Sequence, residues 1–172
     1  MASGTMQLET WNAPPGEAIP NHPSFPVLVY RGVGPVAAGV DACRALFAEH
    51  GWPDSWMGGL FGFHHFHSAS HQVVGVVAGH ARLELGGPQG RAFDVAAGDV
   101  IVLPAGTGHR RVSSGGGFTV VGAHPPGQEH YDLLRGDDPA EVAAARERIA
   151  ALGVPLQDPV GGDGIGRWRT TA

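Results

Sequence analysis

The chain has 172 residues, which suits one domain large enough to bury a hydrophobic core. Its 28 glycines and 14 prolines stand beside 42% hydrophobic residues, a mixture that favours short strands joined by tight turns over disorder. The formal net charge is −5 with only 11 Lys and Arg residues, which argues against binding to a nucleic-acid backbone.

The sequence shows no pattern typical of export or membrane insertion. No stretch approaches the roughly 18 continuous apolar residues of a membrane span, and the N-terminus lacks the basic-then-apolar order of a signal peptide. The lone cysteine, Cys43, excludes an internal disulfide and fits a reducing compartment. We therefore expect a cytoplasmic protein that binds neither membrane nor nucleic acid.

The first elements are a short strand and a helix. Residues 1–26 are predicted to be irregular because their prolines exclude regular helix. A strand over 27–30 follows, and then a helix over 41–50. Asp41 is a plausible N-cap of this helix, and Gly51 ends it.

From residue 59 to about residue 124 the pattern is entirely that of strands. The expected strands cover residues 61–67, 72–78, 80–85, 91–95, 100–103, 109–112 and 118–123. Turn-forming residues such as Gly, Pro, Asp and Ser separate them. Short strands at this regular spacing indicate a sandwich or a small barrel.

A second helix is predicted to start after Asp138, which can cap it together with Glu141, and to end at Gly153. Nothing marks a linker between two domains. We expect one domain over 1–172, with a core barrel over about 59–124, an N-terminal arm over 1–40, and a C-terminal helix and tail over 125–172.

The histidines are the most informative residues of the chain. His65 and His67 lie two positions apart on an expected strand, so both side chains point to the same face. A turn brings Gln72 back beside them, and a Pro-Ala-Gly turn aims His109 inward from a later strand. Three neutral imidazoles suit a divalent transition metal such as Fe, Mn, Ni or Zn.

The spacing of these residues resembles a known family. The segments Gly59-x5-His65-x-His67-x4-Gln72-x6-Gly79 and Gly98-x5-Pro104-x-Gly106-x2-His109-x3-Ser113 are similar to the paired motifs of the cupin superfamily. The resemblance implies an all-β fold, a small double-sheet, jelly-roll-type barrel, here with two peripheral α-helices. It also implies that His65, His67 and His109 are metal ligands. Ser113 replaces the usual asparagine.

Further short motifs point to one branch of the superfamily. Ile19-Pro20-Asn21, Gly51-Trp52, Pro104-Ala105-Gly106-x-Gly108-His109 and Asp158-Pro159-Val160-x-Gly162 are similar to the YjlB-like cupins, and this likeness covers most of residues 17–168. The resemblance supports the fold and the site without supplying a reaction. It also points to a homodimer, as do the Pro-rich arm and the expected sheet edges.

Gln72 stands where the family usually has a glutamate, and an amide oxygen is a neutral, weaker ligand. Three accounts are open: Gln72 ligates through its oxygen, His71 replaces it through a local bulge, or three histidines and water hold the metal. Adjacent strand residues face opposite ways, which disfavours His71. We favour three histidines with Gln72 in or beside the ligand set.

Three further residues are candidates for the substrate pocket: His71, Arg111 and His124. His124 leaves a strand near the barrel mouth and could support a ligand. Arg111 shares a face with His109, where it could meet an anionic substrate or equally pair with a core carboxylate.

These observations predict a metal-binding cupin, possible reactions being oxygenation, isomerisation or decarboxylation of a small molecule. The alternative is a binding or sensing module for a small metabolite. The two motifs hold no obvious carboxylate base, and the missing glutamate somewhat favours that alternative. A storage cupin is the third hypothesis, which a single short barrel makes the weakest.

Overall fold

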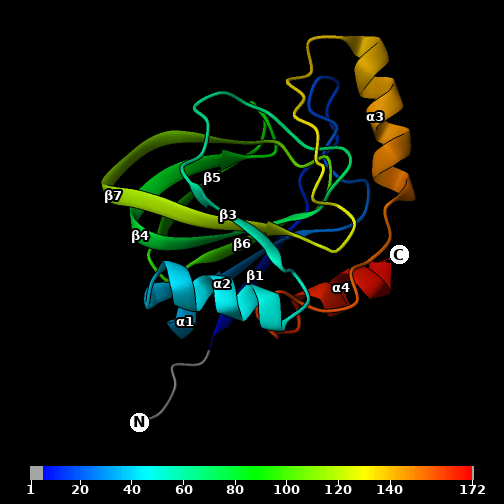
Figure 1. Ribbon diagram of the computed structural model, residues 1–172. Helices are drawn as coiled ribbons and strands as arrows, with labels where there is room; N and C mark the ends of the chain where they lie inside the picture. Colours follow the sequence, from blue (N-terminus) through cyan, green and yellow to red (C-terminus); the bar gives the residue numbers. More distant parts are fainter. Residues whose placement is uncertain (1–5, 172) are drawn as a thin grey trace.

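The computed structural model describes residues 6–171, in which seven antiparallel strands form one strongly curled sheet with the shape of a barrel (Figure 1). Its order is β1-β2-β6-β4-β7-β3, with β5 paired to β4. The strands are β1 (Gln7–Trp11), β2 (Val27–Arg31), β3 (Asp54–Gly58), β4 (Gln72–Leu85), β5 (Arg91–Ala96), β6 (Val100–Leu103) and β7 (His109–His124).

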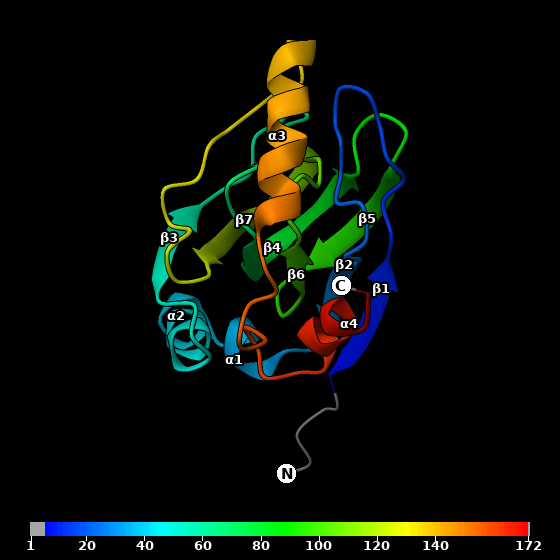
Figure 2. The same cartoon turned by 90° about the vertical axis from the view of Figure 1, so that its right-hand side faces the viewer.

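The helices lie outside the barrel. They are α1 (Gly34–Ala37), α2 (Val40–Glu49), α3 (Pro139–Ala151) and α4 (Gly164–Thr171). Figures 1 and 2 show α1, α2 and α4 on one side of the barrel and α3 upright along another. Within residues 6–171, none of the helices has the length and apolar character that a membrane crossing requires.

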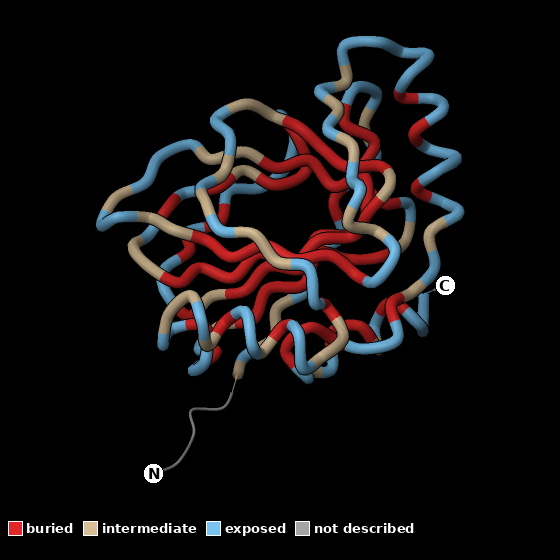
Figure 3. The backbone as a smooth tube through the Cα atoms, viewed as in Figure 1, coloured by how far each residue is buried: buried red, intermediate tan, exposed pale blue. Residues whose placement is uncertain are grey.

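Alternation along the strands separates two hydrophobic clusters. On β2, Val27 and Val29 pack inside the barrel, while Leu28 and Tyr30 pack against the layer of helices. Strand β6 alternates in the same way, and all four of its residues are buried. Because both faces of these strands are covered, their sequences are apolar throughout. Figure 3 shows the buried strands between exposed loops and helix faces.

Several elements agree with the sequence-based predictions. Strand β2, helix α2 and strands β5 and β6 lie within one residue of the expected bounds. Helix α3 begins as expected, because the Asp138 side chain accepts a hydrogen bond from the amide of Ala140 at 2.9 Å. At α2 the expected cap was wrong: Gly39 occupies the N-cap, and Asp41 lies in the first turn.

Two pairs of expected strands are single long strands. Residues 72–78 and 80–85 are joined in β4, and residues 109–112 and 118–123 are joined in β7. Gly79 has φ of 72° and Gly116 and Gly117 have φ of 66° and 73°. The register between β4 and β7 shifts on either side of Ala78. Glycines in this conformation bend a strand without ending its pairing, so the sequence suggested breaks where the sheet bends.

The segment 61–67 is not the regular strand that was expected. It makes only isolated bridges, of His65 with His109 and of Phe66 with Leu134. The pairing is interrupted because neighbouring residues bond to different partners: the amide of His65 donates to the carbonyl of His109, and that of Phe66 to the carbonyl of Leu134.

Other elements were missed. Strand β1 lies inside the segment expected to be irregular, and its residues precede the first proline, so nothing blocks their pairing with β2. Strand β3, which pairs with β7, and the short helices α1 and α4 were also not predicted. The barrel therefore carries two more helices than expected within the described residues.

Asn21 fixes the N-terminal arm beside the turn that carries His109. Its side-chain amide donates to the carbonyls of Pro14 and Gly86, at 2.7 and 3.1 Å, and its oxygen accepts from the amide of Gly108 at 3.0 Å. Its backbone amide donates to the carbonyl of Gly106 at 2.9 Å. These bonds hold the arm, the β4–β5 turn and the His109 turn together.

Candidate metal centre

The structure gathers His65, His67 and His109 at one end of the barrel. The first two lie on the extended segment before β4, and the third begins β7. All three are buried, and one potential ligand atom from each lies within 4.8 Å of the other two. The ring centroids of His65 and His109 are 4.1 Å apart, and those of His67 and His109 are 5.3 Å apart.

Backbone carbonyls fix the orientation of all three rings. Nδ1 of His65 lies 3.0 Å from the carbonyl oxygen of Phe63, Nδ1 of His109 lies 3.0 Å from that of Thr107, and Nδ1 of His67 bonds to that of Asp132. A carbonyl oxygen can only accept, so each Nδ1 carries the proton. The lone pair of each neutral ring is therefore on Nε2, the arrangement typical of metal-ligating histidines.

Burial also keeps these rings neutral. It lowers the pKa of His65 to about 4. Burial lowers the pKa of His67 as well, and it holds the pKa of His109 well below its ordinary value, helped by the neighbouring His65 and His67. At neutral pH all three imidazoles are therefore unprotonated and able to donate a lone pair.

Gln72 lies on the barrel-facing side of β4, in the same alternation as Val74 and Val76. It lines the same pocket as the three histidines and is 3% exposed. Its Oε1 atom and Nε2 of His109 are buried without any hydrogen-bond partner among residues 6–171. Buried polar atoms in folded proteins are nearly always paired, so two unpaired acceptors on residues that line one pocket suit a cation.

Asp132 ties the segment after β7 to the loop that follows His67. Its carboxylate accepts hydrogen bonds from the backbone amides of Ser68 and Ala69, at 2.7 and 3.1 Å, and from the hydroxyl of Ser68. Arg148 on α3 donates to the Ser68 hydroxyl at 2.8 Å and lies 3.7 Å from the carboxylate. Burial raises the pKa of Asp132, but the bonds from Ser68 and Ala69 outweigh it, and the pKa lies below its ordinary value.

The histidines line a pocket of about 240 Å³. The other residues that line it are Trp56, Gly58, Gly59, Leu60, Phe61, Gln72, Tyr131 and Leu133. The site therefore combines a polar floor of three imidazoles and one amide with mainly apolar walls, as is typical of small-molecule sites.

The similarity to one protein of known sequence shows the family to which the chain belongs. The chain is 36% identical over 156 residues to the protein YjlB of Bacillus subtilis (strain 168), covering 91% of this chain and 92% of the other. The chain belongs to the YjlB-like cupins. This confirms the resemblance drawn from the two motifs and the all-β barrel that it implied.

Solved structures give more distant likenesses. Tomato (Solanum lycopersicum) vicilin is 22% identical, with a TM-score of 0.38 over 64% of this chain and 29% of the vicilin chain. The epimerase RmlC of Legionella pneumophila is 13% identical, with a TM-score of 0.32 over 78% of this chain and 75% of its own. This cupin thus spans less than a third of the vicilin chain. No family model matches the sequence.

None of the three expected pocket residues of this cupin lines the pocket, and two of them have their polar atoms bonded elsewhere. His71 lies on the opposite side of the sheet, where its ring centroid is 5.0 Å from that of Trp168. Its Nδ1 accepts from the amide of Ala105, and its Nε2 donates to the carbonyl of Gly153. Both ring nitrogens are occupied, which leaves none for a metal. Arg111 directs its guanidinium to the carbonyl of Leu60, at 3.1 Å, and to the hydroxyl of Ser114.

His124 lies directly behind the pocket wall. Its Nδ1 is 2.8 Å from the hydroxyl of Ser70, and its Nε2 accepts from the indole of Trp56 at 3.4 Å. Its ring stacks on that of Tyr131, with centroids 4.3 Å apart, and the centroids of the Tyr131 and His67 rings are 5.0 Å apart. His124 therefore supports two lining aromatics without lining the pocket itself.

Distant segments contribute parts of the site that were not predicted from the sequence: Trp56 on β3, and Tyr131, Asp132 and Leu133 after β7. No local pattern identifies residues 131–133, because they reach the histidines only when the chain folds back over the barrel mouth. The sole local signal for Trp56 was a large aromatic residue two positions before the pair Gly58 and Gly59.

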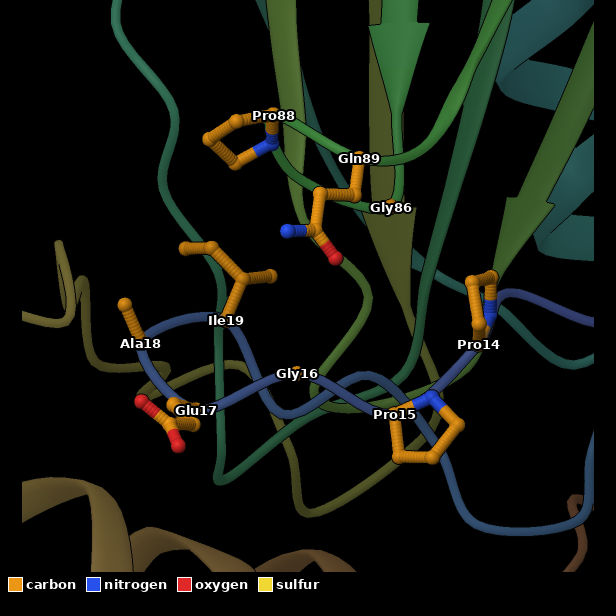
Figure 4. Close-up of a pocket in the computed structure, with 9 residues that line it drawn as sticks. All are labelled: Pro14, Pro15, Gly16, Glu17, Ala18, Ile19, Gly86, Pro88 and Gln89. Atoms are coloured by element: carbon orange, nitrogen blue, oxygen red, sulfur yellow. The ribbon is translucent and has the colours of Figure 1, made fainter.

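A larger cavity, of about 620 Å³, lies between the N-terminal arm and the β4–β5 turn. Figure 4 shows Pro88 and Gln89 of the turn facing Pro15, Glu17 and Ile19 of the arm. Glu17 is the sole ionisable side chain in its described lining. The cavity thus lacks the set of converging polar groups that distinguishes the histidine pocket.

Proposed function

We propose that this cupin holds a divalent transition metal through Nε2 of His65, His67 and His109, with Gln72 beside them. The observation that carries the proposal is the orientation of the rings, since each Nδ1 is bonded to a backbone carbonyl. The unpaired Gln72 oxygen and His109 nitrogen fit the same ion. Nitrogen-rich ligand sets of this kind suit Fe, Mn, Ni or Zn.

We further propose that the protein is a small-molecule metalloenzyme of the oxygenase, isomerase or decarboxylase type. A bound metal would polarise an oxygen-bearing substrate or activate water or O2. The chain itself orients the imidazoles and surrounds the site with apolar walls that exclude water. The described lining contains no carboxylate, so proton transfer would depend on the histidines or Tyr131 rather than on Asp or Glu.

Metal analysis of protein purified without chelator tests the proposal. We expect close to one metal per chain after refeeding with Fe, Mn, Ni or Zn, and loss of most of it in His65→Ala and in His109→Ala. His130→Ala is the matched control because His130 is exposed. An empty site after refeeding, or equal metal in all variants, would exclude the metal centre.

A non-catalytic binding or sensing role is the second candidate. The observation that favours it is the neutral Gln72 in a lining without carboxylates. O2 consumption and product analysis of the metal-loaded protein with small acids and diketones separates the two roles. Turnover lost in His109→Ala supports the enzyme, whereas tight binding of a compound that is recovered unchanged supports the sensor.

We also propose that the protein acts as a cytoplasmic homodimer. The edges of the sheet, β1 and β3, lie at opposite ends of the strand order and each has one neighbour in the described chain. Such edges can pair with a second copy. Light scattering after size-exclusion chromatography gives the oligomeric state, and cell fractionation gives the location.

A further inference from the structure

The walls of the histidine pocket carry no formal charge. Above the polar floor they consist of Trp56, Leu60, Phe61, Tyr131 and Leu133, and none of the described lining residues is Asp, Glu, Lys or Arg. The indole N–H of Trp56 is already directed at His124. A ligand in this space therefore meets mainly apolar surface beyond the histidines.

Arg111 and Arg135 lie near the pocket, but neither lines it. The guanidinium of Arg111 bonds to the carbonyl of Leu60 and the hydroxyl of Ser114. Arg135 lies 4.0 Å from the ring centroid of Phe63 and lines a separate pocket. An anionic group on the body of a ligand would lose water here without gaining a positively charged partner among the residues that line the pocket.

The mouth of the pocket exposes large apolar side chains. Phe61 is 53% exposed, and Tyr131 and Leu133 are each 40% exposed. Exposed apolar surface that rims a pocket is typical of a binding site. The volume of about 240 Å³ falls below the range of about 300–1,000 Å³ that holds drug-sized ligands. The pocket therefore suits a compound smaller than those.

Building on the proposed metal site, we propose that the pocket selects a small ligand with one polar end and an uncharged, apolar body, such as an aromatic ring. The polar end faces His65, His67 and His109. The body packs against Trp56 and Leu133, and compounds with a second charged group at the far end are rejected.

The test uses three hydroxamates that share one metal-binding group: acetohydroxamate, benzohydroxamate and 4-carboxybenzohydroxamate. The protein is loaded with Co(II), whose visible absorption reports binding without any reaction. We expect benzohydroxamate to bind at least about tenfold more tightly than either of the other two, because only it adds apolar contact without a buried charge.

Variants of Leu133 test whether this side chain provides the selectivity for benzohydroxamate. Leu133→Ala is expected to weaken the binding of benzohydroxamate several-fold, while the affinity for acetohydroxamate and the Co(II) content stay nearly unchanged. Leu133→Arg is expected to favour 4-carboxybenzohydroxamate over benzohydroxamate. Leu156→Ala is the matched control, since Leu156 is 93% exposed and does not line the pocket.

The possible failures are distinguishable. If wild type takes up one Co(II) but binds 4-carboxybenzohydroxamate as tightly as benzohydroxamate, the proposed selectivity is wrong and the metal site stands. The proposed selectivity is also wrong, and the metal site stands, if Leu133→Ala leaves the affinities for all three hydroxamates unchanged. A protein that takes up no Co(II) overturns the metal site and, with it, this inference.

Discussion

Gln72 places a neutral amide where the cupin motif usually has a charged carboxylate. Its oxygen is buried and unpaired, so without metal it weakens the fold, since a buried acceptor without a partner costs about 1–3 kcal/mol. The same oxygen lines the pocket beside the histidines. Substitutions at this position therefore affect the stability of the metal-free protein and the affinity for metal in opposite directions.

Gln72→Glu is expected to raise affinity for the divalent ion by about tenfold or more, because it adds a negative charge beside the site. Gln72→Leu should lower metal affinity and leave the metal-free protein as stable as wild type or more so. Competition with a chromophoric chelator measures affinity, and urea unfolding measures stability. Gln89→Glu, at an exposed position, is the control for charge alone. Equal affinity in all four proteins would place Gln72 outside the ligand set.

Asp132 acts on His67 through its backbone carbonyl and on the neighbouring loop through its carboxylate. Asp132→Ala keeps the carbonyl that bonds to His67 but removes the carboxylate that holds this segment in place, so metal affinity should fall by up to about tenfold. It should also reduce the free energy of unfolding by about 1–3 kcal/mol. Chelator competition and urea unfolding measure the two effects.

Asp94→Ala is the matched control, because this carboxylate pairs with Arg82 on the exposed surface. It should leave metal affinity unchanged and alter the stability little. Full metal affinity in Asp132→Ala would show that the carboxylate does not help to position His67.

Strand β3 contributes Trp56 to the pocket because β7 has a glycine at the paired position, Gly122. A Cβ atom at residue 122 would lie 2.2 Å from the indole ring. Gly122→Ala should push Trp56 out of its place, lower the unfolding free energy by about 1–3 kcal/mol and weaken benzohydroxamate binding. Thermal unfolding and tryptophan fluorescence measure this.

Gly166→Ala on α4 is the control for the added methyl group, because a Cβ there meets nothing within 4 Å. Alanine in a helix interior should be neutral or slightly stabilising. If Gly122→Ala and Gly166→Ala have the same Tm as wild type, the close approach of β3 to β7 is not required.

The motif Asp158-Pro159-Val160-x-Gly162 shows that part of the YjlB likeness serves the fold. The carboxylate of Asp158 accepts from the Tyr30 hydroxyl and from the amides of Val160 and Gly162. The amides of Gly164 and Ile165 bond to the Tyr30 hydroxyl and to the Asp158 carboxylate, which holds the start of α4 against β2. Burial, together with the bond to Asp158, raises the pKa of Tyr30, so this hydroxyl remains a donor at physiological pH.

Two histidines outside the metal site link the stability of the molecule to pH. Burial lowers the pKa of His22 to about 4, helped by His71, and burial lowers the pKa of His71 to about 4. Nδ1 of His22 accepts from the amide of Phe25 at 2.8 Å, and Nδ1 of His71 accepts from that of Ala105 at 2.9 Å. Protonation of either Nδ1 would break its bond.

The unfolded chain binds these protons near pH 6.5 and the folded chain only near pH 4, so unfolding takes up protons between these values. The stability from both residues is therefore present above pH 6.5 and lost as the pH falls towards 4, by about 1–3 kcal/mol for each. Urea unfolding of the metal-free protein across this pH range measures the loss of stability.

His22→Asn keeps an acceptor without a titrating group, so its stability should depend less steeply on pH than that of wild type. His80→Asn is the control, because His80 is exposed, and its stability should depend on pH as in wild type. Equal slopes in all three would refute the assignment.

The sequence by itself predicted an all-β fold of short strands and the helix after Asp138, because two-residue alternation, turn residues and helix caps are local properties of the chain. The barrel followed from the resemblance to the cupin motifs. The fixed spacing of His65 and His67 relative to His109 was enough to identify the family motif.

Only the tertiary structure decided what surrounds these histidines. Trp56, Tyr131 and Asp132 come to the site from separate segments, through contacts between residues tens of positions apart that no local pattern contains. The opposite placements of His71 and Gln72 followed from alternation, but the bonds that occupy both nitrogens of His71 did not. Burial likewise depends on the folded chain, and burial is what keeps the three imidazoles neutral.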